Sequence, residues 1–170
     1  MYVKSGIKLP AFIAGGGQEN GNRSGTENTQ GISGLGLATE LAYDNLEDKQ
    51  LHIINLNNRL REGLMSELDD IIVNGTIDMG IDVSDYGKRF PSVLNVSFLG
   101  ARGEVILHTL EQDEIFVSTG SACSSHKNSD SHVLAAMGLG HKEIEGAIRF
   151  SISEFNTLEE MDEVAAKVSA

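Results

Sequence analysis

The sequence of 170 residues holds one cysteine and no tryptophan, and aromatic residues make up only 5% of it. One cysteine cannot form an internal disulfide, which is typical of proteins in a reducing cytoplasm. So few aromatic side chains offer little surface on which nucleobases could stack. No apolar run approaches the ~20 residues that span a bilayer, and the N-terminal stretch is too short and too interrupted for a secretory signal. These absences predict a cytoplasmic protein.

Positive charge is also scarce. The chain has 13 lysine and arginine residues against 25 aspartate and glutamate residues, for a formal net charge of −12. A chain of this charge repels phosphate backbones and anionic lipid, so we expect neither nucleic acid nor a membrane as a partner. Hydrophobic residues make up 40% of the chain, which is enough for the packed core of a domain.

The spacing of apolar residues predicts the order of elements. After a short strand at 9–14 and a glycine-rich loop, a capping box at Ser24 and Glu27 predicts one long helix, or two joined near Asp48, that ends around Asp69. Short β-like runs then alternate with short helical runs. The expected strands are 71–73, 93–98, 115–117 and 147–153, and the expected helices are 103–110, 131–137 (capped by Asp130), 142–146 and 158–168 (capped by Thr157). This order predicts an α+β, two-layer fold in which a short sheet packs with helices, preceded by a long helix.

The only cysteine, Cys123, lies in the run STGSACSS at 118–125. A lone cysteine is more often a small buried hydrophobe than a nucleophile, but the small, hydroxylated flanks here would anchor no core. His126 and Lys127 follow and favour the thiolate, so we predict a nucleophile on a flexible tether. A Cys-His hydrolase would need a rigidly held pair. A metal site from Cys123, His126 and His132 is a weak signal with a single thiolate, and we predict no metal.

The glycine-rich loop from Gly15 to Thr29 precedes the predicted helix and carries hydroxyl and amide groups at Ser24, Thr26 and Asn28. Glycines let backbone N–H groups approach a ligand, and the N-terminus of a helix favours anions. The loop therefore predicts an oxyanion or phosphate site.

Arg149 lies in the otherwise apolar run AIRFSI, which predicts a strand. A guanidinium in such a place binds a carboxylate. The sequence leaves open whether that carboxylate belongs to the protein, as a structural ion pair, or to a substrate.

The chain contains, in this order, the motifs GGGQENGNRSGTENT, FPSVLNVSFLG, STGSACSS, SHVLAAMGL and AIRFSISEFNT. Together they closely resemble the cysteine desulfurases of the NifS and IscS type, and STGSACSS resembles the group with the longer cysteine loop. The resemblance implies a homodimeric fold-type I enzyme that uses pyridoxal phosphate. Such enzymes convert L-cysteine to L-alanine, hold the sulfur as a persulfide, and pass it to a scaffold or other acceptor protein for Fe–S cluster assembly.

The resemblance also implies roles for three residues. Cys123 matches the persulfide-forming nucleophile, and Arg149 matches the arginine that binds the substrate carboxylate. Thr26 matches the threonine that reaches the cofactor phosphate of the second subunit of the homodimer.

One departure from the family concerns the cofactor. In the family, the lysine that binds pyridoxal phosphate lies just upstream of the strand that matches Tyr2 and Val3, and no lysine of this chain lies in that motif. We therefore expect the N-terminal large domain to be missing, with residues 1–23 a remnant of its edge and of the cofactor loop, and residues 24–170 the C-terminal small domain. Such a chain alone should neither hold pyridoxal phosphate tightly nor release alanine. A non-enzymatic persulfide carrier and an interaction module remain alternatives.

Overall fold

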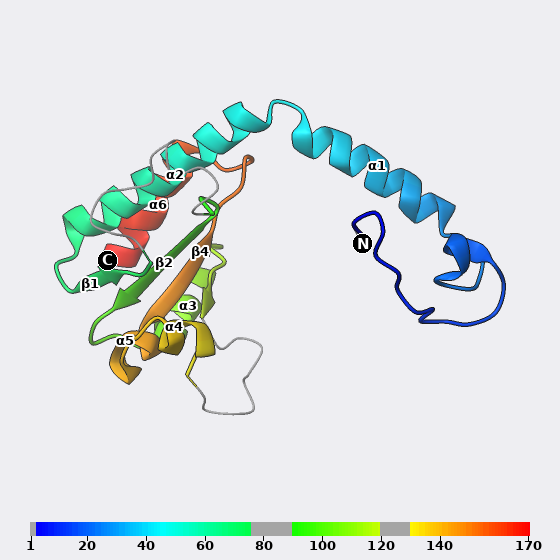
Figure 1. Cartoon of the computed structure of the whole chain (residues 1–170). Helices are drawn as coiled ribbons and strands as arrows, with labels where there is room; N and C mark the ends of the chain where they lie inside the picture. The colour runs from blue at the N-terminus through cyan, green and yellow to red at the C-terminus, as the bar shows by residue number, and fades with distance from the viewer. Residues whose placement is uncertain (1–2, 76–89, 120–129) are drawn as a thin grey trace. The chain divides into compact units, whose positions relative to one another are not determined.

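The computed structural model describes residues 3–75, 90–119 and 130–170 (Figure 1). The chain divides into two compact units, residues 1–46 and 47–170. The predicted domain boundary between residues 23 and 24 divides the chain by family domain and not by compactness. These two compact units do not test it, so it stays a prediction. Within the described residues, no helix is both long enough and apolar enough to cross a membrane.

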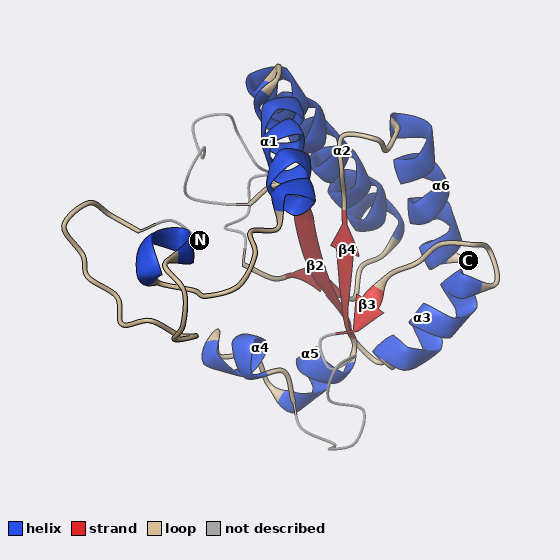
Figure 2. Cartoon of the chain, turned by 90° about the vertical axis from the view of Figure 1, so that its right-hand side faces the viewer, coloured by secondary structure: helices blue, strands red, loops and turns tan. Residues whose placement is uncertain are grey.

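The second unit is built on a four-stranded antiparallel sheet in the order β1-β2-β4-β3. The strands are β1 (Ile71–Val73), β2 (Val93–Phe98), β3 (Ser118–Thr119) and β4 (Ala147–Ser151). The helices are α2 (Leu46–Glu67), α3 (Gly103–Glu111), α4 (His132–Ala136), α5 (His141–Glu145) and α6 (Leu158–Ser169). The helices α2 and α6 cover one face of the sheet, and α3 lies beside β3 (Figures 1 and 2). The predicted α+β, two-layer fold is confirmed.

The hydrophobic core lies between that face of the sheet and the two helices. Alternate residues of a strand point to the same face, and the alternate apolar residues of β2 and β4 are buried. Residues four apart share a helix face, which brings leucines of α2 against the sheet. The buried cluster includes Leu56, Leu60 and Leu64 of α2, Leu94, Val96 and Phe98 of β2, Ile148 and Phe150 of β4, and Met161 and Ala165 of α6. The apolar residues that alternate in β2 and β4 and recur every four residues in α2 therefore form the core.

The opposite face of the sheet carries the other alternate residues, and these are mainly polar. Asn95 and Ser97 point to it from β2, and Arg149 points to it from β4. This polar face is where the candidate site lies.

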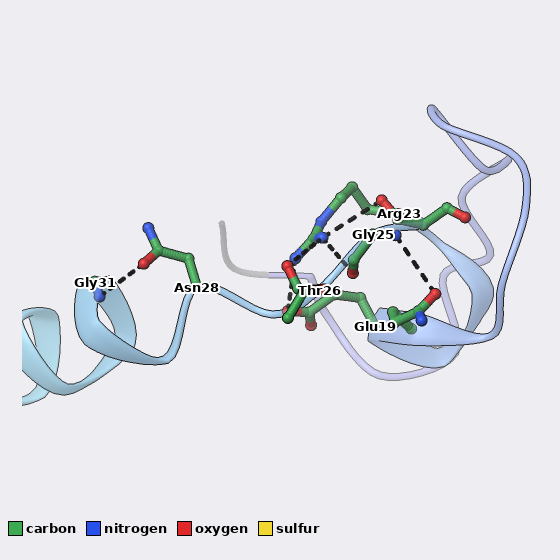
Figure 3. A network of polar contacts seen from close by, with 8 residues as sticks. Glu19, Arg23, Gly25, Thr26, Asn28 and Gly31 are labelled. Carbon is green, nitrogen blue, oxygen red and sulfur yellow. Dashed lines mark hydrogen bonds and ion pairs between the residues drawn. The ribbon is translucent and has the colours of Figure 1, made fainter.

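In its described residues, the first unit holds a loop with a short 3-10 helix, η1 (Gln18–Gly21), followed by one α-helix, α1 (Thr29–Tyr43). The expected strand at 9–14 is wrong, because this stretch forms only an isolated bridge between Ile13 and Arg23. The expected helix start at Ser24 is also wrong. Asn28 caps α1 by accepting a hydrogen bond from the Gly31 N–H at 3.0 Å (Figure 3). The Ser24 hydroxyl instead donates within the loop to the Gly16 carbonyl.

Other boundaries differ by a few residues. The helical run breaks before Asp48, because Asn45 adopts a left-handed conformation with φ of 50° that a helix cannot continue. The strand expected at 115–117 pairs instead at Ser118–Thr119. Ser131, not Asp130, caps α4 through a hydrogen bond from the Leu134 N–H. The capping box of Thr157 at the start of α6 is confirmed.

Candidate functional site

Arg149 is exposed in a strand whose neighbouring residues, Ile148 and Phe150, are buried. The alternation of β4 sends those two side chains into the core and the guanidinium to the polar face. Among the described residues, no carboxylate forms an ion pair with Arg149. The structural ion pair left open by the sequence is therefore not found among the described residues, and the Arg149 guanidinium is an exposed donor on the polar face.

A row of polar residues crosses the sheet at the level of Arg149. Arg149 pairs across strands with Asn95 on one side and with Ser118 on the other. Asn74, directly after β1, continues the row, since its N–H donates to the Asn95 carbonyl at 2.8 Å. Sequence reasoning missed Asn74 and Asn95. The sequence did mark Asn95, because it is a polar residue in the apolar run VLNVSF. It also stands at one of the alternate strand positions that point to the polar face.

The side chains of this row are connected through Asn74. Its Nδ2 donates to Asn95 Oδ1 at 2.7 Å and to the hydroxyl of the fully buried Ser97 at 2.8 Å. Because the Asn95 oxygen accepts from Asn74, the Asn95 carboxamide is held in one orientation. The sheet therefore presents a fixed amide beside a guanidinium.

In the first unit, the loop around Thr26 is held by Arg23 (Figure 3). One nitrogen of the guanidinium donates to the carbonyl oxygens of Gly25 and Thr26 at 2.7 and 3.1 Å, and the other pairs with Glu19 at 3.5 Å. Arg23 thus organises its own loop. Thr26 is exposed, and its hydroxyl makes no hydrogen bond to another described residue.

The described residues do not fit a complete pyridoxal phosphate site. Such a site needs a lysine amine for the aldehyde and several donors for the phosphate. In the glycine-rich loop the Arg23 guanidinium is bound to carbonyl oxygens, so the side-chain donors left for a phosphate include the Thr26 hydroxyl and the amino group of Asn28, whose oxygen caps α1. Cys123, the predicted nucleophile, lies outside the described residues, which stop at Thr119 and resume at Asp130.

Residues 15–164 match the family model described as aminotransferase class-V. This chain belongs to the class-V aminotransferase family. It is 42% identical over 164 residues to the cysteine desulfurase IscS of Clostridium botulinum, covering 96% of this chain and 40% of that protein. It is 39% identical to a cysteine desulfurase of Sinorhizobium fredii, covering 100% of this chain and 42% of that one.

Solved structures agree with these sequence relationships. A NifS-like protein superposes with a TM-score of 0.79 at 33% identity, over 99% of this chain and 40% of that one. The NifS-like protein of Rickettsia africae gives a TM-score of 0.73 at 28% identity, over 95% of this chain and 39% of that one. These neighbours confirm the predicted fold class, that of fold-type I enzymes. The class-V chain described here spans about two-fifths of the length of the relatives it matches.

Proposed function

We propose that this chain is the C-terminal small domain, residues 24–170, of a cysteine desulfurase, with residues 1–23 belonging to the large-domain edge and the cofactor loop. In this proposal the complete enzyme converts L-cysteine to L-alanine and holds the sulfur as a persulfide on Cys123. The observation that carries the proposal is Arg149, an exposed guanidinium on the polar face of the sheet with no carboxylate partner among the described residues.

Arg149 binds the carboxylate of L-cysteine in this proposal. A guanidinium offers two parallel N–H donors to a carboxylate, which fixes the orientation of the substrate as well as its charge. Because β4 lies between β2 and β3 and its alternate residues are in the core, the Cα of Arg149 is rigidly placed. The strand therefore supplies a fixed anchor for one end of a small amino acid.

Chain length supports the assignment of Cys123 as the nucleophile. Ser118 pairs with Arg149, and Thr119 pairs with Ile148. Cys123 follows Thr119 by four residues, and an extended chain spans at most about 3.6 Å per residue, so the connecting segment has a reach of at most about 14 Å. In this proposal the thiol reaches the L-cysteine held by Arg149 and accepts its sulfur.

The remaining parts of the site come from other polypeptide in this proposal. The Thr26 hydroxyl would donate a hydrogen bond to the cofactor phosphate in the second subunit of a homodimer. The large domain would provide the lysine that binds pyridoxal phosphate. Pyridoxal phosphate, when bound there, supplies the electron sink for chemistry on the amino acid. A scaffold or other acceptor protein receives the sulfur for Fe–S cluster assembly. We place the protein in the cytoplasm, where a single thiol stays reduced.

The proposal is tested in two stages. The purified chain with pyridoxal phosphate and L-cysteine is expected to release no more alanine than a control without protein. A fusion of this chain to the preceding part of the Clostridium botulinum relative is then expected to release alanine and to gain one sulfur atom at Cys123 by mass spectrometry. In the fusion, Cys123→Ser should abolish the persulfide, and Arg149→Lys should raise the KM for L-cysteine.

Two outcomes would contradict the proposal. One is a folded, cofactor-loaded fusion that releases no alanine. The other is a fusion in which Arg149→Lys leaves the KM unchanged. If the chain instead gains sulfur only when a separate desulfurase is added, it is a persulfide carrier, and if Cys123→Ser changes nothing measurable, it is an interaction module.

A further inference from the structure

Arg149 does not stand alone on the polar face of the sheet. The register places Asn95 directly opposite it on β2. The Cβ atoms of such cross-strand pairs lie about 4.5–5.5 Å apart, so the carboxamide of Asn95 and the stem of Arg149 are direct neighbours. A molecule that binds the guanidinium from above the sheet also meets the Asn95 side chain.

The orientation of the Asn95 carboxamide decides what it offers to such a molecule. Its Oδ1 accepts from Asn74 Nδ2, which comes from the β1 side of the row. The oxygen and the amino group of a carboxamide occupy opposite branches of one planar group. The Asn95 amino group is therefore turned away from Asn74, toward the side on which β4 carries Arg149.

Asn74 holds this orientation at a cost. Its Nδ2 donates to both Asn95 and Ser97, while its own Oδ1 is buried without a hydrogen-bond partner. An unsatisfied buried polar atom costs about 1–3 kcal/mol. Reversing the amide would instead bury an amino group with two unsatisfied protons, so the observed orientation is the better of the two.

The result is a pair of adjacent donors with no acceptor between them. The Asn95 amino group and the Arg149 guanidinium cannot hydrogen-bond to each other, because neither has a free lone pair. Among the described residues, neither group has an acceptor. A carboxylate has two oxygens with about four acceptor sites, which is enough to accept from both donors at once.

We propose that Asn95 Nδ2 donates a hydrogen bond to the carboxylate that Arg149 binds, and that Asn74 is the positioning residue that turns the Asn95 amide toward it. The ligand class is a small amino acid carboxylate. This inference rests on the proposed function of Arg149 and adds a second contact to it. A hydrogen bond to a charged acceptor is stronger than one between neutral groups, so the contact contributes measurably to affinity.

The test uses the isotopically labelled chain of 170 residues and follows the Asn95 side-chain NH2 and the Arg149 Nε–H resonances by NMR during titration with L-alanine. L-alanine carries the same carboxylate as L-cysteine and has no thiol to oxidise. Both resonances are expected to shift and to give the same Kd. In Asn74→Ala, the Arg149 resonance should still shift, with a weaker Kd, while the Asn95 resonance shifts less.

The decisive variant is Asn95→Asp. It keeps the oxygen that accepts from Asn74 and the shape of the side chain, but it replaces the donor beside Arg149 with a negatively charged acceptor. We expect the Kd for L-alanine to rise by about 10-fold or more, which corresponds to ~1.4 kcal/mol, while the melting temperature changes little. The matched control is Asn55→Asp on the exposed side of α2, which changes the net charge equally and should leave the Kd unchanged. Asn95→Ala provides a second variant that removes the donor without adding charge.

The outcomes separate this inference from the proposed function. If Arg149 responds and Arg149→Gln abolishes binding, but the Asn95 resonance does not move or Asn95→Asp and Asn95→Ala bind like the wild type, then the role of Asn95 is overturned and that of Arg149 stands. If neither resonance responds to L-alanine, both are overturned.

Discussion

Two consecutive helices of this protein, α1 and α2, are separated by two residues, Asp44 and Asn45, and differ sharply in burial. The more apolar one, α1, carries a single charged residue, Glu40, and buries none of its residues. The more polar one, α2, buries a stripe that includes Leu56, Leu60 and Leu64. Burial is therefore decided by the surface available to a helix and not by its own hydrophobicity.

The difference also bears on how each helix is stabilised. In α2, burial of apolar area contributes roughly 25 cal/mol per Å². In α1, Ile32, Leu35, Leu37 and Leu41 are each more than half exposed, and an isolated helix of this length is marginal in water. A Cβ added at Gly34 or Gly36 would meet no atom within 4 Å, so no described residue packs closely against these two glycines. We expect α1 to depend on a surface outside the described residues, which under the proposed function is the large domain or the second subunit.

The largest difference should come from truncating one leucine in each helix. Leu60 is 1% exposed in the core and Leu35 is 66% exposed. Leu60→Ala is expected to lower the free energy of unfolding by about 2–5 kcal/mol, because it leaves a cavity. Leu35→Ala should change it by less than ~0.5 kcal/mol. Urea denaturation followed by circular dichroism measures both, and equal losses would mean that α1 is packed in solution.

Glycines give the next largest contrast. Gly146 is buried, and a Cβ there would clash with the Phe98 carbonyl oxygen and lie 2.9 Å from the Ala101 carbonyl oxygen. Gly146→Ala should therefore cost about 1–3 kcal/mol. Gly36→Ala in α1 should instead raise the helix content, since alanine favours a helix by about 1 kcal/mol over glycine. A loss of helix signal in Gly36→Ala would indicate that a neighbour packs against that glycine.

Removing the N-cap of α6 and that of α1 should give a smaller difference in stability between the two units. Thr157 accepts from the Glu160 N–H at 3.2 Å at the start of α6, and Asn28 accepts from the Gly31 N–H at 3.0 Å at the start of α1. Thr157→Ala is expected to lower the free energy of unfolding by ~1 kcal/mol. Asn28→Ala should reduce only the helicity of α1. Hydrogen exchange of the core strands distinguishes the two variants. Faster exchange of β2 in Asn28→Ala would contradict the expectation that the cap of α1 does not affect the stability of the second unit.

The smallest effect is a pH dependence in the packed unit. The hydrogen bond from Arg59 of α2 lowers the pKa of the Asp162 carboxyl on α6, with a distance of 2.9 Å between Arg59 Nη2 and Asp162 Oδ2. A lowered folded pKa gives stability that is present above the unfolded pKa of aspartate and is lost as the pH falls through the folded value. The difference in stability between wild type and Asp162→Asn should thus shrink in acid. Thermal melts from above the unfolded pKa of aspartate down through the lowered folded pKa measure it. In an Arg59→Gln background, which lacks the hydrogen bond to Asp162, the same stability difference should lose this trend.

The sequence predicted most of the packed unit because its signals are local. Apolar spacing predicted the helical run that contains α2 and the strands β2 and β4, and the run AIRFSI predicted that Arg149 lies in a strand. The start of α1 could not be read in this way, because Ser24 and Asn28 both match a cap and the choice depends on bonds inside the loop. A local signal marked Asn95 as a polar residue in an apolar run, but its place beside Arg149 follows only from the register of the two strands, which no local pattern encodes.

The internal bonds of Arg23 have one more consequence. By gathering the carbonyl oxygens of Gly25 and Thr26 around its guanidinium, this side chain restricts a glycine-rich segment that would otherwise sample many backbone conformations. A molecule that contacts Thr26 therefore meets a segment whose shape is already selected, and less entropy is lost on association. Replacing Arg23 should therefore make a molecule associate with Thr26 more slowly and more weakly, although Arg23 contacts only the main chain of Thr26.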